Sequence, residues 1–357
     1  MGQNTIERAV RYIQEPAALL KTLDLAVKTK DLEVPSTFIG AKTVKYQTIK
    51  FEDYDLGDFD REKGYGTKGT ILEWTEQTMT QDKGDSLYID KMDDEEAMAN
   101  GIVRIANRYI MQVQAPAVDK YRLSKIAAAT HTNVVVGTFT ADNIISKLLD
   151  GRKLLTNSHI NLANTILYIS ASAETALAGV TMNKGTLSLG NWNGNMEAKV
   201  NMFKEAKIVV VPDDYLPSGV QAILLNLDVA AAMKKYSECK YFSEIPGYGG
   251  RRAQADIGIY HDCFTYLEIE RGIVLFLEDT SKTFTIKYNK GAADGSETAP
   301  SQAASKPGTA ITLAAATFTY TGHTFVGWDD GSNLYPAGAK YIVPNAAVTL
   351  TARWKTS

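Results

Sequence analysis

The sequence has little cysteine, little histidine and no long apolar run, and each shortage excludes a class of protein. Its 357 residues include two cysteines, Cys239 and Cys263, and four histidines. Two cysteines without a CxxC motif or the Cys/His spacing of a zinc site build neither a disulfide framework nor a zinc site, so we expect a reducing compartment. No stretch of about 18 apolar residues occurs, and charges stand where a signal peptide needs an apolar core. We therefore expect neither a membrane span nor secretion by the usual route.

An excess of charge of either sign is also missing. The formal net charge is -3, so no basic excess predicts tight binding to nucleic acid through released counterions. Hydrophobic residues make up 45% of the chain and charged residues 22%, which is an ordinary globular composition that can bury a sizeable core. The length predicts two or three domains.

Three short motifs could carry chemistry, and each has a stronger structural interpretation. Gly64–Thr70 has the glycines and lysine of a phosphate loop, but a strand follows where a phosphate loop needs a helix. His261 and Cys263 share one face of a strand, and we favour buried side chains over a nucleophile and its base. Arg251 and Arg252 follow a glycine-rich turn and are expected to pair with acids of a neighbouring subunit. With no triad, paired acids or metal spacing, the sequence predicts no enzyme, no cofactor and no metal site.

The acidic stretch Asp82–Ala97 is interpreted as a strand, an acidic cap and the start of a helix. Ser86–Ile89 alternates polar and apolar residues, as a strand does. Asp93 or Asp94 can cap the first free N–H groups, and Glu96 suits the positive end of the helix dipole. A calcium loop would need glycine-punctuated ligands that this stretch lacks.

A long helix is predicted from near Asp93 to beyond Arg122. Pro116 removes a backbone donor and should bend it. Apolar residues recur every three or four positions and predict its buried face: Met98, Ile102, Ile105, Tyr109, Val113 and Ala117.

The remaining chain is predicted to alternate between segments of different type. Residues 5–30 form a helical arm divided at Pro16, and residues 36–82 a two-stranded excursion with a glycine-rich tip. Residues 139–250 alternate helices and strands in one α/β unit, including a helix at 228–236. A glycine loop and two hairpin-forming strands should then return to Ser86–Ile89. After about Thr280 a small all-β domain is expected, with a long loop from Gly291 to Gly308.

Five motifs appear in a familiar order: LGDFDREKGYG, TMTQDKGDSLYIDKMDDEEA, VDKYRLSKIAAA, ILYISASAETAL and ADIGIYHDCFTYLEIERGIVLF. Over residues 1–280 the chain resembles the major capsid proteins of tailed bacteriophages with the Hong Kong 97 type fold. The resemblance implies an α+β fold and divides the chain into an N-terminal arm (1–35), an E-loop (36–90), a peripheral domain with a spine helix (91–138 and 251–282), an axial domain (139–250) and a β-rich surface domain (283–357).

The same resemblance implies a function in assembly. The chain would self-assemble as hexamers and pentamers into an icosahedral head shell, made in the bacterial cytoplasm and enclosing double-stranded DNA by weak, non-specific contact. A separate scaffolding protein and a portal are the implied partners, while an encapsulin-like compartment and an adhesive surface protein remain alternatives. The residues expected at contacts between subunits, in the E-loop and the glycine loop, are Asp53, Asp55, Asp58, Asp60, Arg61, Lys63, Lys68, Arg251 and Arg252.

The C-terminal segment Thr321–Trp354 resembles the repeat named for Listeria and Bacteroides surface proteins, also called the internalin B repeat. The matching points are the Gly327–Trp328 pair, the later proline and the closing Trp354, and Trp328, Leu350 and Trp354 are the predicted core. Val348, Leu350, Ala352 and Trp354 share one face of a predicted strand that Trp328 can cover. An immunoglobulin-like module is the alternative. We expect this domain to face outward, where it could bind a host surface or a glycan.

Overall fold

The computed structural model describes residues 23, 26–34, 43–51, 61, 70–90, 93, 101–184, 202–242, 252–278 and 282–356. Most of the predicted N-terminal arm and the predicted glycine-rich tip lie outside these residues. The chain divides into two compact units. The first combines Met1–Val44, Thr78–Leu123 and Ala231–Phe264, and the second combines Lys45–Gln77, Ser124–Ala230 and Thr265–Ser357.

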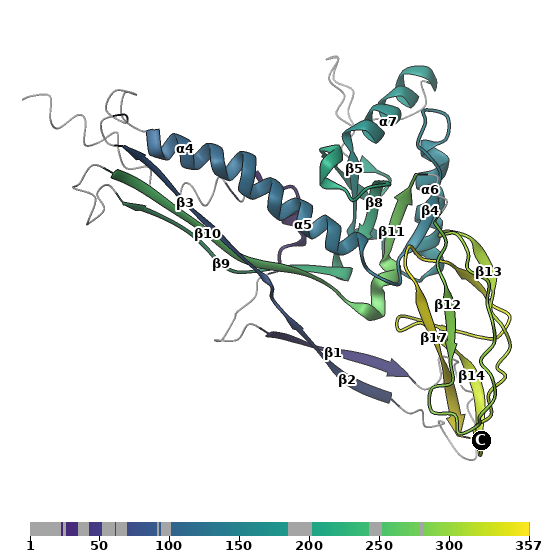
Figure 1. Ribbon diagram of the computed structural model, residues 1–357. Coiled ribbons are helices and arrows are strands. Elements are labelled where there is room, and N and C mark those ends of the chain that lie inside the picture. The colour runs from purple at the N-terminus through teal and green to yellow at the C-terminus, as the bar shows by residue number, and fades with distance from the viewer. Residues whose placement is uncertain are drawn as a thin grey trace, which may run out of the picture. The chain divides into compact units, whose positions relative to one another are not determined.

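The first unit packs a long helix on a three-stranded sheet of order β3-β10-β9 (Figure 1). β10 runs antiparallel to β3, with Gly258 opposite Gly84. One apolar cluster joins the helix to Ala253, Ala255, Ile257 and Ile259 of β10. The elements are η1 (Lys30–Leu32), β3 (Gln81–Asp90), α4 (Gly101–Tyr109), a π-helical turn η2 (Ile110–Gln114), α5 (Ala115–Ala127), β9 (Ala230–Phe242) and β10 (Arg252–Thr265).

The predicted long helix is present from Gly101 to Ala127, and its predicted start near Asp93 lies next to residues outside the described ones. Its predicted buried face is only partly right, because Ile102 is buried and Tyr109 packs against the apolar cluster, but Ile105 and Val113 are exposed. The π-helical turn ends where the N–H of Ala115 donates to the carbonyl of Ile110, immediately before Pro116. This wider turn accommodates a ring that lacks a backbone donor, and it rotates the rest of the helix. After the turn the helix buries Ala115 and Val118 and leaves Val113 47% exposed. Before the turn, Ile102, Ala106 and Ile110 are buried at four-residue spacing, which leaves Ile105 40% exposed.

The second unit contains a six-stranded mixed sheet, a two-stranded ribbon and the C-terminal strands. The six-stranded sheet has the order β4-β11-β8-β5-β7-β6, and β1 pairs with β2 in the ribbon. The elements outside the C-terminal strands are β1 (Thr43–Phe51), β2 (Thr70–Thr78), β4 (Asn133–Val136), α6 (Ile144–Asn157), η3 (Leu162–Asn164), β5 (Thr165–Ser170), α7 (Ala171–Lys184), β6 (Met202–Phe203), β7 (Ala206–Val211), η4 (Asp213–Tyr215), β8 (Val220–Asn226), η5 (Leu227–Val229), η6 (Leu267–Gly272) and β11 (Ile273–Leu277).

Two sequence predictions are corrected here. The segment expected as a helix at 228–236 is instead a 3-10 turn that leads into strand β9. The two strands expected as a hairpin separate: β10 pairs with β3, as predicted, but β11 lies between β4 and β8 in the other sheet. β11 has the sequence IVLFL and all five of its residues are buried, which suits a central strand.

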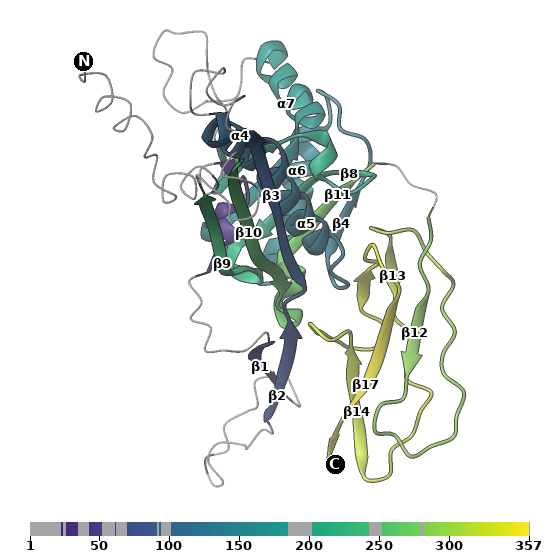
Figure 2. The same cartoon turned by 60° about the vertical axis from the view of Figure 1, so that its left-hand side comes forward.

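The C-terminal residues form a four-stranded sheet of order β12-β17-β14-β15 and a separate β13-β16 pair. Figure 2 shows β12, β13, β14 and β17 of these strands. Val348, Leu350 and Ala352 alternate inward on β17, as the sequence predicts, and Trp328 is fully buried beside them. Residues from Gly291 to Ala304 contain no regular element, which agrees with the predicted loop. The strands are β12 (Ile286–Asn289), β13 (Ala310–Thr312), β14 (His323–Asp329), β15 (Leu334–Tyr335), β16 (Lys340–Ile342) and β17 (Val348–Thr356).

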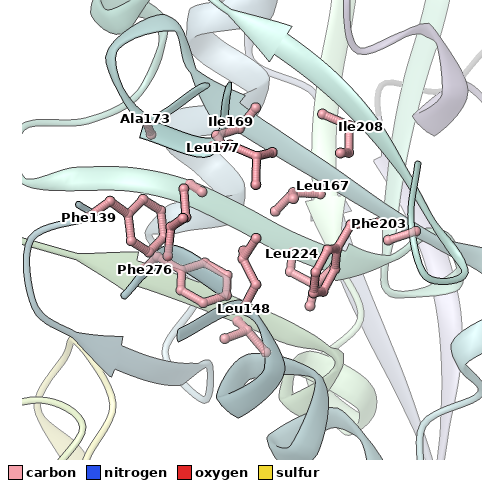
Figure 3. Packing of buried hydrophobic residues seen from close by; sticks show 14 of the residues in the cluster. Phe139, Leu148, Leu167, Ile169, Ala173, Leu177, Phe203, Ile208, Leu224 and Phe276 are labelled. Atoms are coloured by element: carbon pink, nitrogen blue, oxygen red, sulfur yellow. The ribbon is translucent and has the colours of Figure 1, made fainter. Parts of the chain in front are cut away.

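The core of the six-stranded sheet is apolar and closely packed (Figure 3). Leu148 of α6 and Phe276 of β11 meet there, and the rings of Phe139 and Phe276 lie 5.4 Å apart. Gly151 lets α6 approach, because a Cβ at this position would lie 2.5 Å from Cζ of Phe276. The sheet and its helices therefore share one apolar core.

Candidate functional site

The residues predicted at subunit contacts fall mostly outside the described residues. Arg61 lies in an exposed turn. Arg252 begins β10, with its guanidinium 4.2 Å from the ring centre of Tyr88. Asp93 is helical and exposed. The predicted contact residues outside the described ones are Asp53, Asp55, Asp58, Asp60, Lys63, Lys68 and Arg251, and the predicted helix-cap residues Asp94 and Glu96 also lie outside them.

The β1–β2 ribbon carries two exposed large apolar side chains, and one of them, Trp74, is the most exposed such side chain among the described residues. Leu72 is 58% and Trp74 is 65% exposed, and both point to the same face of β2 because they are two residues apart. Lys45 pairs with Glu76 across the strands. A two-stranded ribbon is marginally stable alone, and an exposed apolar face marks a binding surface. The exposed apolar face of the ribbon is therefore a candidate surface for binding another protein chain.

A buried carboxylate anchors the chain where the ribbon ends. Asp262 of β10 accepts hydrogen bonds from the backbone N–H of Thr80 at 2.7 Å and from the hydroxyl of Tyr121 at 2.6 Å. Burial and the hydrogen bond to Asp262 raise the pKa of Tyr121 to about 12. Tyr260 also donates to the carbonyl of Met79 at 3.0 Å. The residues after β2 are thus fixed to the helix and to β10.

A second buried network holds residues 28–34 against the same helix. Asp119 accepts from the backbone N–H groups of Lys28 and Thr29 at 2.9 and 3.0 Å. Arg122 is fully buried and donates to Glu33 at 2.9 Å. Burial raises the pKa of Asp119, although its hydrogen bonds and Arg122 oppose this. The sequence motif that contains Asp119, Tyr121 and Arg122 contributed to the family resemblance, but these anchoring roles were not predicted.

A buried ion pair ties the C-terminal strands to the segment before β11. Arg271 donates to Asp330 at 2.7 Å, with both side chains nearly inaccessible to water, and its guanidinium lies 4.8 Å from the ring centre of Tyr341. Burial would raise the pKa of Asp330, but the charge of Arg271 holds it below its ordinary value. Gly308 also approaches β4, since a Cβ there would lie 3.2 Å from the carbonyl oxygen of Val134.

The aromatic core of the C-terminal strands is built around Trp328. Its indole N–H donates to the carbonyl of Ala314 at 2.8 Å, and the rings of Tyr288 and Phe325 lie 4.6 and 5.0 Å away. Leu350 is fully buried, whereas Trp354 is half-buried and donates to the carbonyl of Lys290. These contacts place the three predicted core residues in one cluster.

His261 and Cys263, the pair considered in the sequence as a base and a nucleophile, are buried in the core. His261 is 3% and Cys263 is 2% exposed. Burial, with a smaller effect of Arg122, lowers the pKa of His261 to about 4. Within the described ranges, no group of three His, Cys, Asp or Glu residues could hold a metal ion, and no helix is long and apolar enough to cross a membrane.

Comparison with solved structures identifies the fold. The capsid structure of the cyanophage P-SCSP1u matches with a TM-score of 0.53 at 11% identity, covering 71% of this chain and 88% of that one. The mature capsid of bacteriophage PhiM1 matches with a TM-score of 0.50 at 13% identity, covering 70% and 91%. No protein-family model and no curated protein matches the sequence. The predicted α+β fold of phage capsid proteins is therefore confirmed, and the all-β C-terminal region is compatible with it.

Proposed function

We propose that the chain is the structural subunit of a bacteriophage head, which binds copies of itself to close an icosahedral shell around double-stranded DNA. The observation that carries this proposal is the fold shared with two phage capsids. The work of such a subunit is non-covalent self-association, so the proposal requires no catalytic group. The shell would be assembled in the bacterial cytoplasm and would form the outer layer of the virion.

The ribbon gives the proposal its most specific physical support. Leu72 and Trp74 keep a large apolar area in water, and association removes such area at about 25 cal/mol per Å². A neighbouring subunit that covers this face of the ribbon would gain this free energy.

The C-terminal strands would lie on the outer surface of the shell. An inward domain on every subunit would compete with DNA for volume, whereas an outward one leaves the interior free. A position outside also makes the domain available to a host surface or a glycan. Its likeness to the internalin B repeat stays a prediction from the sequence.

The proposal is tested by removing the apolar face of the ribbon. The full-length protein and its Trp74→Asp variant would be compared by sedimentation velocity, with Trp74→Phe as the control that retains an apolar ring. We expect wild type and Trp74→Phe to form large closed particles and Trp74→Asp to remain as small folded species. Equal assembly of all three proteins would contradict a contact at the ribbon, and no assembly of wild type would contradict the shell itself.

A further inference from the structure

The C-terminal strands and the six-stranded sheet have separate apolar cores. The core of the C-terminal strands gathers around Trp328, and among the described residues none belongs both to it and to the core of the sheet in Figure 3. The contact between the two includes a buried ion pair, in which Arg271 donates to Asp330 and lies over the ring of Tyr341. We call this contact the polar joint. Because each side has its own core, the joint can open while both cores stay packed.

His131 is buried beside this ion pair. It precedes β4, is 8% exposed, and its Nδ1 lies 3.9 Å from Oδ2 of Asp330, the same oxygen that Arg271 holds at 2.7 Å. A distance of 3.9 Å is too long for a hydrogen bond, and Nδ1 has no other hydrogen-bond partner and is inaccessible to water. The backbone N–H of His131 donates to Glu270 at 3.0 Å, which fixes the residue in place. The polar joint therefore contains a titratable ring nitrogen that neither a protein group nor water satisfies.

The surroundings of His131 oppose a positive charge on its ring. Burial has the largest effect and lowers the pKa of His131 below its ordinary value. The charges that face the ring act in both directions: the carboxylates of Asp330, Glu270 and Asp329 raise the pKa, and the guanidinium of Arg271 lowers it. Asp329 and Asp330 come from the end of β14, and Glu270 and Arg271 from η6. In the closed joint the ring is therefore neutral at pH values where a histidine in water takes up a proton.

We propose that the polar joint opens in mild acid, when proton uptake by His131 releases the C-terminal strands from the six-stranded sheet while both keep their folded cores. The direction follows from which state binds the proton. In the closed joint the proton would enter a desolvated place close to Arg271, whereas in the open joint His131 is in water and titrates near its ordinary pKa of about 6.5.

The size of the effect follows from this difference in proton binding. Above about pH 6.5 the open joint gains nothing from the proton, and the preference for the closed joint is complete. Each pH unit below that value raises the ratio of open to closed molecules about tenfold, until the closed joint itself takes up the proton. The opening does not depend on shell formation, since every residue that it uses belongs to the second unit.

The test is hydroxyl-radical oxidation of the full-length protein, with rates measured by mass spectrometry over minutes so that they report the fraction of open molecules. Tyr341 is fully buried under Arg271 and is uncovered by opening, whereas Trp328 is fully buried inside the C-terminal core and stays covered. Tyr88 is 61% exposed and serves as the reference for radical dose. We expect the oxidation rate of Tyr341 to rise about tenfold from about pH 6.5 to about pH 5.5, with that of Trp328 unchanged.

Two histidine variants assign the response to one residue. His131→Asn keeps an N–H₂ group near the position of Nδ1 but takes up no proton in this range, so its Tyr341 oxidation should not depend on pH. The matched control is His159→Asn, at an exposed position of the same unit whose φ of 58° suits asparagine, and it should respond as wild type does.

Three results would overturn the proposal. The first is a Tyr341 oxidation rate in wild type that does not change with pH, and the second is an equal rise in His131→Asn. The third is a parallel rise for Trp328, which would show that the C-terminal strands unfold instead of separating from the sheet. Circular dichroism would establish that each variant folds, and the comparison of Tyr341 with Trp328 in wild type decides the question if His131→Asn does not.

Discussion

Replacing Asp330 by asparagine should strongly destabilise the second unit. The new side chain would still accept hydrogen bonds from the backbone N–H groups of Ser332 and Asn333, which Oδ1 of Asp330 holds at 2.9 and 2.7 Å. It would, however, present an amide N–H₂ or a neutral oxygen to Arg271, whose side chain is 3% exposed. The substitution therefore leaves a buried positive charge without its counter-ion while preserving the turn.

The expected magnitude follows from that burial. Breaking a buried ion pair by removing one partner costs about 3–5 kcal/mol, because the remaining charge is desolvated and uncompensated. For a unit of this size, each 1 kcal/mol lowers the melting temperature by about 2–4 °C. We therefore expect the transition of the second unit to fall by about 6–20 °C.

Differential scanning calorimetry of the full chain measures this shift. The matched control is Glu205→Gln, which breaks the solvent-exposed Arg152–Glu205 pair and should leave the transition unmoved. The double variant Arg271→Met with Asp330→Asn removes the buried charge and should recover most of the loss. Equal melting temperatures for Asp330→Asn and Glu205→Gln would refute the claim that the Arg271–Asp330 pair holds the C-terminal strands to the segment before β11.

Truncation, acid and DNA binding each test a different part of the molecule. Truncation after Thr280 removes Asp330 but also exposes Arg271 to solvent, so the truncated chain should fold and assemble. Its particles should lack surface protrusions in electron micrographs, and failure to assemble would place the C-terminal strands in the shell's own contacts. The free energy of unfolding should fall as the pH is lowered from about 6.5 to 4, and His261 alone should account for about 3 kcal/mol of this loss. The reason is that the pKa of His261 is about 4 in the folded protein and higher in the unfolded chain, so only the unfolded chain takes up the proton in that range. Urea unfolding at several pH values in that range should show that the free energy of unfolding of His261→Gln depends less steeply on pH than that of wild type. An equal dependence on pH in the two proteins would contradict the assignment to His261. Binding of the unassembled chain to DNA should be weaker than about 1 μM at physiological salt, as expected from a net charge of -3, and salt-resistant binding below that value in a filter assay would disagree.

Local periodicity predicted much of the fold. β5, β7 and β8 are short apolar runs, and α6 and α7 have helical patterns, so all five were predictable from neighbouring residues. The alternation of Val348, Leu350 and Ala352 likewise predicted the inner face of β17. These segments have a local preference that agrees with their tertiary environment.

The sequence predictions fail where contacts between residues far apart in the chain determine the structure. Ala230, Ala231 and Ala232 favour a helix locally, but β9 is extended because it pairs with β10 and buries all three alanines. Pro116 predicted a bend, whereas the wider turn before it changed which residues face the sheet. The partners of β11 could not be deduced, since no local feature distinguishes the two sheets.

The buried networks of charged residues could not be predicted from local sequence patterns either. Asp119, Arg122, Asp262 and Arg271 look like ordinary charged residues in the sequence, and only their distant partners bury them. Their position inside a recognisable motif was the available indication for these charged residues. It marks a residue to examine, but it does not name the partner.

The most direct test of the central claim is electron microscopy of the purified full-length protein after expression in bacteria. The proposed function predicts closed, hollow particles of uniform size, built from many copies of the chain. Monomers, or open aggregates without a closed shell at concentrations where wild type is folded, would contradict it.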